Sequence, residues 1–548
     1  MNIYPVKNIM PDPQESPIGY AERLGLVHAS AVSQDHKKKN GQFFTPVEIA
    51  EHMASLSRIK GRVVRILDPG CGAGILTCAL AEHLAKVSPS TGMMEFTAYE
   101  TDPAMVPVAR QTLEYLVRWL EERNITASYR LCEGDFILAH AFSLQEDREL
   151  FKKSIQQFDI IISNPPYFKL PIRDPRVQAA RLVVKGHPNI YSLFMAVSAA
   201  LVREGGELIF ITPRSYASGG YFTRFREYFF RKIQLTDAHL FVSRKETFGR
   251  DKVLQETVII RGEKSSIAPE APIRITSSGG IGDLKEAGEK IFPYWNIVDL
   301  YTAEKIFYLP TSDYEEAVLE IFRDWNSTMK DYGIQISTGR VVSFRAREFI
   351  HEVPENTSVV VPENAVEVLT GVPGIAPLYW LHNVQRMELQ WPVPKPGKGQ
   401  YMEVGEKSGP LLIPDKNYIF LRRFSSKDDQ HRLVAAPYFP PLPNDQEVTG
   451  NGYIGVENKV NYIYRPSGHL ERNEVLGLCA LLNSQLFDTF FRIFNGNVNV
   501  SATELRAMPL PPLEIIHSIG NEISRSGNES VENADRIVKE YFQPVISQ

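Results

Sequence analysis

The stretch Val63-Val64-Arg65-Ile66-Leu67-Asp68-Pro69-Gly70-Cys71-Gly72-Ala73-Gly74 decides the fold class of this chain. Its β-branched start predicts a strand over Val63–Leu67, and the glycine-rich turn leads into a helix predicted over Gly74–Lys86. Glycines allow the backbone to turn tightly and to approach a ligand, and the helix N-terminus favours polar or anionic groups. A plain strand-to-helix turn remains the alternative, and the Gly-x-Gly-x-x-Gly spacing of a dinucleotide fold is absent.

The same alternation of strand and helix patterns continues as far as Arg261. Six further strands are predicted over Glu95–Tyr99, Tyr129–Cys132, Phe158–Ser163, Glu207–Thr212, Asp237–Val242 and Glu256–Arg261. Helices are predicted over Pro103–Glu122 and Ile190–Arg203, where apolar residues recur at three- and four-residue spacing. This order is typical of a doubly wound α/β domain, here with a mainly parallel seven-stranded sheet covered by helices.

Length and composition predict a second domain. With 548 residues, 43% apolar and 23% charged, the chain is long enough for two large globular domains. Frequent prolines between short predicted strands, such as Asn417–Leu421 and Lys459–Tyr464, indicate an α+β second half with long loops. The predicted organisation is residues 1–34 as an N-terminal extension, 35–265 as the α/β domain, 266–289 as a Ser-, Gly- and Pro-rich linker, 290–515 as the second domain, and 516–548 as a peripheral helical tail.

Charge and cysteine content argue against several classes of protein. The 60 Lys and Arg residues against 65 Asp and Glu residues give a net charge of -5, far from the basic balance usual for a nucleic-acid binder. Four cysteines without a Cys-x-x-Cys or Cys/His cluster indicate neither a disulfide framework nor a metal site. The N-terminus has no secretory pattern and no apolar run is long enough for a membrane span, so we expect a cytoplasmic protein without a membrane partner.

Acidic residues end or follow the first three predicted strands. They are Asp68, Glu100 and Asp135. Because the carboxyl ends of parallel strands meet at one edge of the sheet, these residues predict a nucleoside pocket there, in which the Glu100 carboxylate accepts the ribose hydroxyls. Acidic residues that simply end strands remain the alternative.

The fourth predicted strand runs into the sequence Asp159-Ile160-Ile161-Ile162-Ser163-Asn164-Pro165-Pro166-Tyr167. The two prolines predict a rigid loop at the same sheet edge, with two fewer N–H donors but with its carbonyl acceptors intact. If the Asn164 side-chain oxygen and the Pro165 carbonyl accept the two N–H bonds of an amine on an aromatic ring, the lone pair of that nitrogen points at an electrophile such as a methyl sulfonium. Tyr167 would stack on the ring, and the reaction would need neither a cysteine nucleophile nor a metal.

Taken together, these motifs resemble the S-adenosylmethionine-dependent adenine-N6 DNA methyltransferases of type II restriction–modification systems, with the gamma-type motif order. The resemblance covers about residues 35–262 and implies a Rossmann-like methyltransferase domain. It rests on Gln42-Phe43-Phe44-Thr45-Pro46, the glycine turn, Glu100, Asp135-Phe136, Asn164-Pro165-Pro166-Tyr167, and Phe248 ahead of Val258-Ile259-Ile260-Arg261.

The resemblance also implies roles for individual residues. Those that would bind S-adenosyl-L-methionine are Phe43, Thr45, Pro46, Asp68, Gly70, Gly72, Gly74, Glu100, Asp135, Phe136 and Asn164. Those that would act on the target base are Asn164, Pro165, Pro166, Tyr167 and Phe248. Plainer interpretations stay open, because Phe43 and Phe44 suit a hydrophobic staple, Thr45 suits an N-cap, and Phe248 suits the core.

An enzyme of this kind must swing its adenine out of the duplex, so it needs a DNA-binding surface. Basic stretches at 169–185 and 214–252 follow strand ends on the active-site side, and we interpret them as phosphate contacts, with a solvated surface as the alternative. The resemblance implies that 290–515 is a target-recognition domain, although the match there is loose. The candidate DNA contacts are Lys169, Arg173, Arg214, Arg422, Arg423 and Lys427.

The sequence therefore predicts a monomeric, site-specific adenine-N6 methyltransferase. Its expected partners are double-stranded DNA with a short recognition sequence and, functionally, a separate restriction endonuclease. One alternative is an amino-methyltransferase acting on RNA or protein, since those families also use Asn-Pro-Pro-Tyr loops. Another is a bifunctional restriction–modification enzyme, for which Pro414-Asp415-Lys416 is the nearest nuclease-like fragment, without a convincing partner carboxylate.

Overall fold

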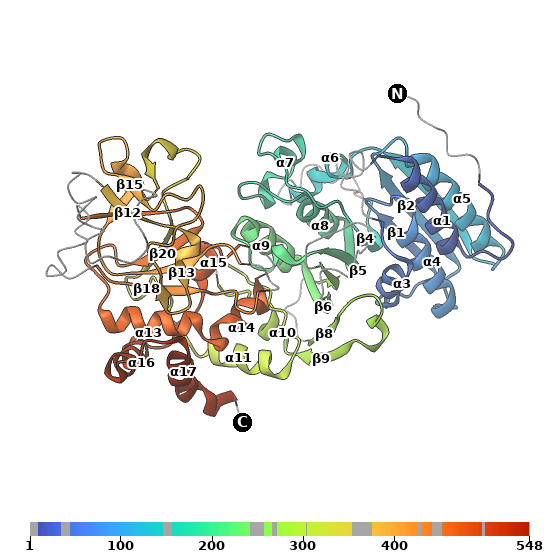
Figure 1. The fold of residues 1–548 in the computed structure, drawn as a ribbon. Coiled ribbons are helices and arrows are strands. Elements are labelled where there is room, and N and C mark those ends of the chain that lie inside the picture. The colour runs from blue at the N-terminus through green and yellow to red at the C-terminus, as the bar shows by residue number, and fades with distance from the viewer. Residues whose placement is uncertain are drawn as a thin grey trace. The chain divides into compact units, whose positions relative to one another are not determined.

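The computed structural model shows two compact units, Met1–Thr311 and Ser312–Gln548 (Figure 1). The described residues are 9–33, 44–145, 156–241, 257–265, 271–302, 304–352, 375–425, 429–440, 452–495 and 499–546.

The first unit is built on a nine-stranded sheet with the order β3-β2-β1-β4-β5-β7-β6-β8-β9. Its strands are β1 (Val63–Asp68), β2 (Met93–Glu100), β3 (Thr126–Glu133), β4 (Phe158–Ser163), β5 (Val202–Pro213), β6 (Ile233–Phe241), β7 (Thr257–Lys264), β8 (Ile273–Ser278) and β9 (Gly288–Phe292). Strands β1 to β5 pair in parallel, whereas β7 runs antiparallel to both β5 and β6. The predicted α/β class with a mainly parallel sheet is confirmed, and β8 and β9 extend the seven predicted strands.

Helices cover both faces of this sheet because alternate residues of its central strands point to opposite sides. Ile160 and Ile162 of β4 belong to a core that includes residues of α1, α3, α4 and α5. Ile161 belongs to a second core, with residues of α6, α8 and α9. The α-helices of this unit are α1 (Pro17–Ala31), α3 (Val47–Ser55), α4 (Ile75–Val87), α5 (Val106–Glu121), α6 (Phe136–His140), α7 (Pro175–Ala179), α8 (Ile190–Leu201), α9 (Thr223–Lys232) and α10 (Tyr294–Ile297).

Two predicted boundaries of the first unit differ from the structure. The stretch 266–289, expected to be a linker, contains β8, in which Ile273 and Ile275 are buried in the sheet core and the Arg274 guanidinium donates to the Asp237 carboxylate at 2.7 Å. The expected N-terminal extension contains α1, whose Leu24 is fully buried in the same core as α4 and α5. Both segments therefore belong to the first unit, which ends at Thr311.

The second unit combines three small sheets with helices, in agreement with the α+β class. The sheet orders are β10-β20-β17-β18, β11-β15-β12-β19-β16 and β13-β14. The strands are β10 (Gln335–Thr338), β11 (Ile350–His351), β12 (Ile375–Tyr379), β13 (Val384–Gln385), β14 (Glu388–Leu389), β15 (Tyr401–Glu403), β16 (Leu412–Pro414), β17 (Tyr418–Arg422), β18 (Ala435–Tyr438), β19 (Tyr453–Val456) and β20 (Val460–Tyr464). The α-helices are α11 (Asp313–Arg323), α13 (Arg472–Asn483), α14 (Gln485–Phe494), α15 (Ala502–Ala507), α16 (Leu513–Ser526) and α17 (Val531–Ile546).

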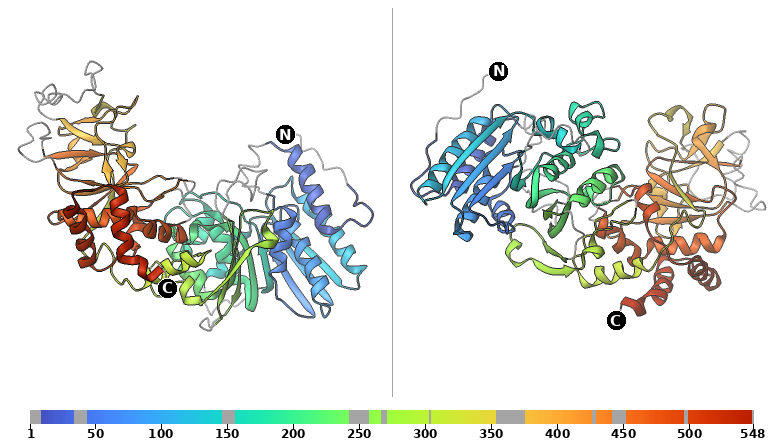
Figure 2. Two further views of the ribbon diagram at one scale, coloured as in Figure 1. Left: turned by 60° about the horizontal axis from the view of Figure 1, so that its bottom comes forward. Right: turned by 180° about the vertical axis from the view of Figure 1, so that it is seen from behind.

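The C-terminal segment 516–548, expected to be a peripheral tail, is part of the packed second unit. In Figure 2 its helices lie with α13 on one side of the strands of that unit. Helices α13 and α16 cross so closely that a Cβ atom at Gly477 would lie 1.9 Å from the carbonyl oxygen of Ile516, and one at Gly520 would lie 1.8 Å from that of Asn473. Only glycine permits this approach.

Within the described ranges, none of the helices has the length and apolarity required to cross a membrane.

Candidate active site

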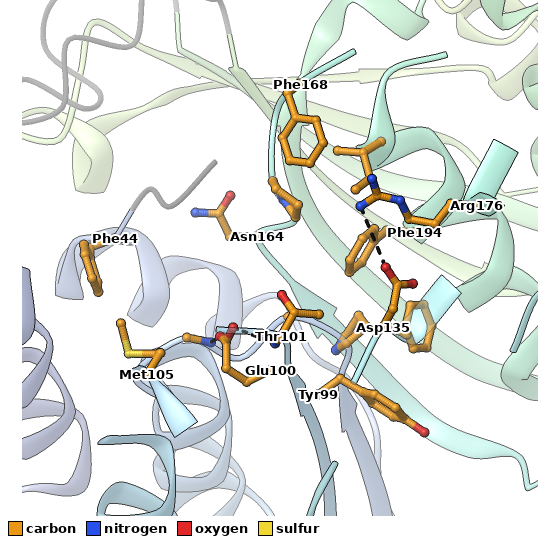
Figure 3. Close-up of a pocket in the computed structure, with 16 residues that line it drawn as sticks. Phe44, Tyr99, Glu100, Thr101, Met105, Asp135, Asn164, Phe168, Arg176 and Phe194 are labelled. Atoms are coloured by element: carbon orange, nitrogen blue, oxygen red, sulfur yellow. Dashed lines mark hydrogen bonds and ion pairs between the residues drawn. The ribbon is translucent and has the colours of Figure 1, made fainter. Parts of the chain in front are cut away.

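A cavity of about 280 Å³ lies where β1, β2, β3 and β4 end (Figure 3). In Figure 3, Phe44 and Met105 lie at one end of this space, Phe194 and Arg176 at the other, and Asn164 between them. The lining residues are Phe44, Pro69, Gly70, Gly72, Tyr99, Glu100, Thr101, Met105, Asp135, Phe136, Asn164, Pro166, Phe168, Arg176, Ile190 and Phe194. The structure thus brings seven of the predicted site residues to one cavity: Gly70, Gly72, Glu100, Asp135, Phe136, Asn164 and Pro166.

Asp68 and Gly74, two predicted cofactor contacts, do not line the cavity but shape its glycine turn. The buried Asp68 carboxylate accepts the Thr77 hydroxyl at 2.9 Å and the Gly70 N–H at 3.4 Å. Burial raises the pKa of Asp68 to about 7. Gly74 begins α4 with a φ of +87°, a left-handed conformation that favours glycine.

The Glu100 carboxylate is already held by the backbone on three sides. It accepts N–H groups from Gly72 at 3.1 Å, Thr101 at 2.7 Å and Asp102 at 2.8 Å. Burial raises the pKa of Glu100, and these hydrogen bonds oppose that rise. Because a carboxylate offers about four acceptor sites, Glu100 in this arrangement still has an acceptor site for a hydroxyl group.

An aromatic slot and a carboxylate stand at the other end of the cavity. The ring of Phe136 packs edge-on against Tyr99, with centroids 5.5 Å apart, and at a tilt against Phe194 at 5.4 Å. One oxygen of Asp135 accepts the Leu138 N–H at 2.9 Å and so caps α6. This combination of flat apolar surfaces and an acceptor suits a purine ring with an amino group.

Arg176 is a cavity residue that the sequence interpretation had placed only in a basic stretch. Its guanidinium forms an ion pair with Asp174 at 2.7 Å and lies 3.8 Å from the Asp135 carboxylate, the contact drawn in Figure 3. It also lies 5.8 Å from the ring centroid of Phe168. The contact with Asp135 does not follow from a sequence spacing, because Asp135 and Arg176 belong to separate elements.

Other lining residues were also missed by the site prediction. They are Phe44, Pro69, Tyr99, Thr101, Met105, Phe168, Ile190 and Phe194. A signal existed for some of them, since Tyr99 and Thr101 flank Glu100, and Ile190 and Phe194 have the four-residue spacing of one helix face.

The Asn164 side-chain amide is oriented by two hydroxyl groups. Its Nδ2 donates to Thr45 Oγ1 at 3.0 Å, and its Oδ1 accepts the Tyr167 hydroxyl at 2.5 Å. The same hydroxyl lies 3.1 Å from the Ile211 carbonyl, and burial raises the pKa of Tyr167 well above its usual value, so the phenol stays protonated. Thr45, next to Pro46 at the start of α3, is therefore connected to the Asn-Pro-Pro-Tyr loop, of which Pro165 is also a buried member.

The predicted DNA contacts differ in their surroundings. Lys169 and Arg173 are exposed, whereas Arg214 is only 3% exposed, so its assignment to a phosphate is corrected. Arg422 donates to the Val384 carbonyl at 2.7 Å and supports β13 instead of facing solvent. Phe43, Phe248 and Lys427 lie outside the described residues.

The nuclease-like fragment Pro414-Asp415-Lys416 is engaged in packing. The Asp415 carboxylate accepts the Tyr438 hydroxyl at 2.7 Å. The Lys416 ammonium donates to the carbonyls of Arg465 at 2.6 Å and Gly468 at 2.8 Å. These contacts give the fragment a structural role in the second unit.

Comparison with known proteins places this geometry in context. The chain is 31% identical to the type II methyltransferase M.BsuBI of Bacillus subtilis over 505 aligned residues. The alignment covers 92% of this chain and 93% of M.BsuBI. The chain is also 30% identical to the type II methyltransferase M.PstI of Providencia stuartii over 514 residues. This alignment covers 94% of this chain and 95% of M.PstI. The Eco57I restriction-modification methylase family matches residues 100–248. Among solved structures, a type I restriction-modification methyltransferase subunit from Streptococcus thermophilus is 14% identical with a TM-score of 0.35, covering 48% of this chain and 58% of that one.

Proposed function

Because this chain belongs to the type II methyltransferases of restriction–modification systems, site-specific DNA-modifying enzymes that use S-adenosyl-L-methionine, we propose that it methylates the exocyclic amine of adenine in duplex DNA. The observation that carries the proposal is the Asn164 amide, oriented by Thr45 and Tyr167 at the wall of the cavity. The target adenine would be swung out of the duplex to reach it.

The cavity residues fit S-adenosyl-L-methionine, which supplies an electrophilic methyl group when bound. Its adenine would lie at the end of the cavity lined by Phe136 and Phe194, with Asp135 as an acceptor. Glu100 would accept a ribose hydroxyl at its remaining acceptor site. The methionine part would then lie toward Phe44, at the opposite end of the cavity in Figure 3.

Asn164 and the Pro165 carbonyl would activate the target amine. A carbonyl oxygen accepts more than one hydrogen bond, so the Tyr167 contact with Oδ1 is compatible with the target amine as a second donor. Two accepted N–H bonds make the amine nitrogen more tetrahedral and direct its lone pair at the methyl group. The nitrogen would form the new N–C bond with this pair while the bond between the methyl carbon and sulfur breaks, and the electrons of that bond would stay on sulfur to leave a neutral thioether. The nitrogen would then lose one proton to water, so a catalytic base is not required.

Tyr167 would supply a stacking surface for the flipped base. Its hydroxyl is anchored between Asn164 and the Ile211 carbonyl, which fixes the plane of the ring. A fixed ring would hold the adenine without the entropy cost of ordering a loose side chain.

Methyl transfer to unmodified DNA tests this proposal. The protein is incubated with tritiated S-adenosyl-L-methionine and genomic DNA from a host without adenine methylation, and the DNA is digested to nucleosides. We expect label in N6-methyladenine, no label with Asn164→Ala, and normal labelling with Gln178→Ala, a matched change at an exposed amide. Label on cytosine, label on RNA or protein in preference to DNA, or retained activity in Asn164→Ala would contradict the proposal.

A further inference from the structure

One edge of the four-stranded sheet in the second unit gathers three loops that are far apart in the sequence. Strand β10 ends at Thr338, β17 ends at Arg422, and β20 begins at Val460. In the antiparallel ladders Thr338 lies opposite Asn461, and Arg422 lies opposite Val460. The segments after β10, after β17 and before β20 therefore leave the sheet at the same edge.

Backbone hydrogen bonds fasten these three segments to one another. They run from Gly339 N–H to the Val460 carbonyl (2.8 Å), from Asn458 N–H to the Val341 carbonyl (2.9 Å), and from Arg423 N–H to the Lys459 carbonyl (2.9 Å). Gly339 permits the contact, because a Cβ atom there would lie 2.2 Å from the carbonyl oxygen of Glu457. The edge is thus a preformed surface.

The side chains at this edge are basic and aromatic. We call Phe344, Arg345, Arg423, Phe424 and Lys459 the basic–aromatic edge. Phe344 is 77% exposed with the Arg345 guanidinium 5.4 Å from its ring centroid, and Phe424 is 39% exposed with the Arg423 guanidinium at 5.6 Å. Among the described residues, no carboxylate forms an ion pair with Arg345, Arg423 or Lys459.

The acidic residue nearest the turn lies beneath the surface. Glu457 is 1% exposed, and its carboxylate accepts the Lys459 N–H at 3.0 Å. Burial raises the pKa of Glu457, while the positive charges of Lys459, Lys398 and Arg423 lower it. Glu457 therefore orders the turn from below. Arg345 and Lys459 are exposed, whereas Arg423 is half-buried and its guanidinium also donates to the Asn458 carbonyl at 3.0 Å.

We propose that the basic–aromatic edge is a DNA-contacting surface of the second unit, with Arg345, Arg423 and Lys459 at backbone phosphates and Phe344 against a base or sugar. The inference rests on the proposed function, which requires duplex DNA. In a chain with a net charge of -5, cations without an acidic partner suit a polyanion. A largely exposed aromatic ring gains when it is buried against a base or inserted at a base step.

A charge variant tests the phosphate contacts. Arg345→Ala/Lys459→Ala is compared with the intact chain by fluorescence anisotropy on labelled duplex DNA over a range of salt concentrations. We expect about tenfold weaker binding at about 0.15 M salt, and a plot of log affinity against log salt that is less steep by about 2, since each lost phosphate contact removes about one unit of slope. The matched control is Arg525→Ala/Arg536→Ala, which removes two cations from α16 and α17 and should bind as the intact chain does.

An aromatic series tests the stacking role. Phe344→Ala should weaken DNA binding several-fold with an unchanged salt slope, and Phe344→Trp should retain the affinity, because the larger ring keeps the contact. All variants should keep the melting temperature and S-adenosyl-L-methionine affinity of the intact chain.

The outcomes separate this inference from the proposed function. If the intact chain methylates DNA and the edge variants bind DNA as tightly as the intact chain, the proposed DNA-contacting surface is contradicted and the proposed methylation is not. If the intact chain binds DNA through this edge but transfers no methyl group to adenine, the surface stands and the proposed chemistry falls. If the intact chain neither binds nor methylates DNA, both are overturned.

Discussion

At the scale of single residues, the cavity depends on side chains that hold other side chains. Arg176 illustrates this, because its guanidinium is shared between Asp174 and Asp135. We regard it as a positioning residue that keeps the Asp135 carboxylate turned toward the cavity.

Arg176→Ala should therefore raise the KM for S-adenosyl-L-methionine about 2- to 5-fold, the effect of a partly exposed ion pair, with a smaller change in kcat. Arg176→Lys should recover part of the loss, because it restores the charge without the planar fork of the guanidinium. Steady-state kinetics measure both, with Lys285→Ala, an exposed cation that does not line the cavity, as the control. An unchanged KM in Arg176→Ala would contradict the proposed role of Arg176 in positioning Asp135.

Asp68 gives a prediction about pH. Its pKa is raised to about 7 in the folded chain, whereas an unfolded chain releases the same proton near pH 3.9. Between these pH values the folded state binds more protons at Asp68 than the unfolded state does. The contribution of Asp68 to the free energy of unfolding is therefore complete below about pH 4 and is lost as the pH rises through about 7. Asp68→Asn keeps an acceptor for Thr77 and removes this titration.

Melting temperatures at pH 5, 6 and 7 provide the measurement. From pH 5 to pH 7, the melting temperature of the intact chain should fall by a few degrees relative to that of Asp68→Asn. A parallel pH dependence in the two proteins would show that Asp68 does not titrate in this range.

At the scale of elements, the C-terminal helix α16 is held by a close crossing with α13. Gly520→Ala would put a Cβ atom 1.8 Å from the Asn473 carbonyl, so the helices must separate. We expect a loss of about 1–3 kcal/mol in the free energy of unfolding, the usual cost of overpacking. Ser524→Ala, an exposed change on the same helix, is the control in a denaturant titration, and equal midpoints for the two variants would contradict the tight crossing.

The elements that the sequence predicted correctly are those with a strong local pattern. Ile160, Ile161 and Ile162 identify β4 because a strand buried on both faces is continuously apolar. Strand β8 was missed because only Ile273 and Ile275 are apolar among its six residues and its surroundings are rich in Ser, Gly and charge. Its stability comes from pairing with β6 and β9 and from Arg274. Within the cavity, the glycine turn and Asn164 were predictable from motifs, whereas the pairing of Asp135 with Arg176 depends on tertiary structure.

At the scale of the whole molecule, the two units are continuous in sequence and change over once, after Thr311. A fragment of residues 1–311 should therefore fold and bind S-adenosyl-L-methionine. A fragment of residues 1–265, cut at the boundary that the sequence suggested, lacks β8 and β9 and leaves β6 as an unpaired edge without the ion pair from Arg274 to Asp237.

Isothermal titration calorimetry and size-exclusion chromatography distinguish the two fragments. We expect cofactor binding and a monomer peak for 1–311, and aggregation or lost binding for 1–265. Equal behaviour would mean that β8 and β9 are dispensable for the catalytic unit.

The single changeover after Thr311 also bears on recombination between the genes of related enzymes. The described strands and helices of the second unit all follow this point, so one recombination event there would replace the complete second unit and leave the first unit, with its cavity and the Asn164 loop, intact. Crossovers at 265 or 290 would instead divide the nine-stranded sheet between two parents. Productive natural hybrids, or chimeras made in the laboratory, should accordingly have their junctions near residue 312.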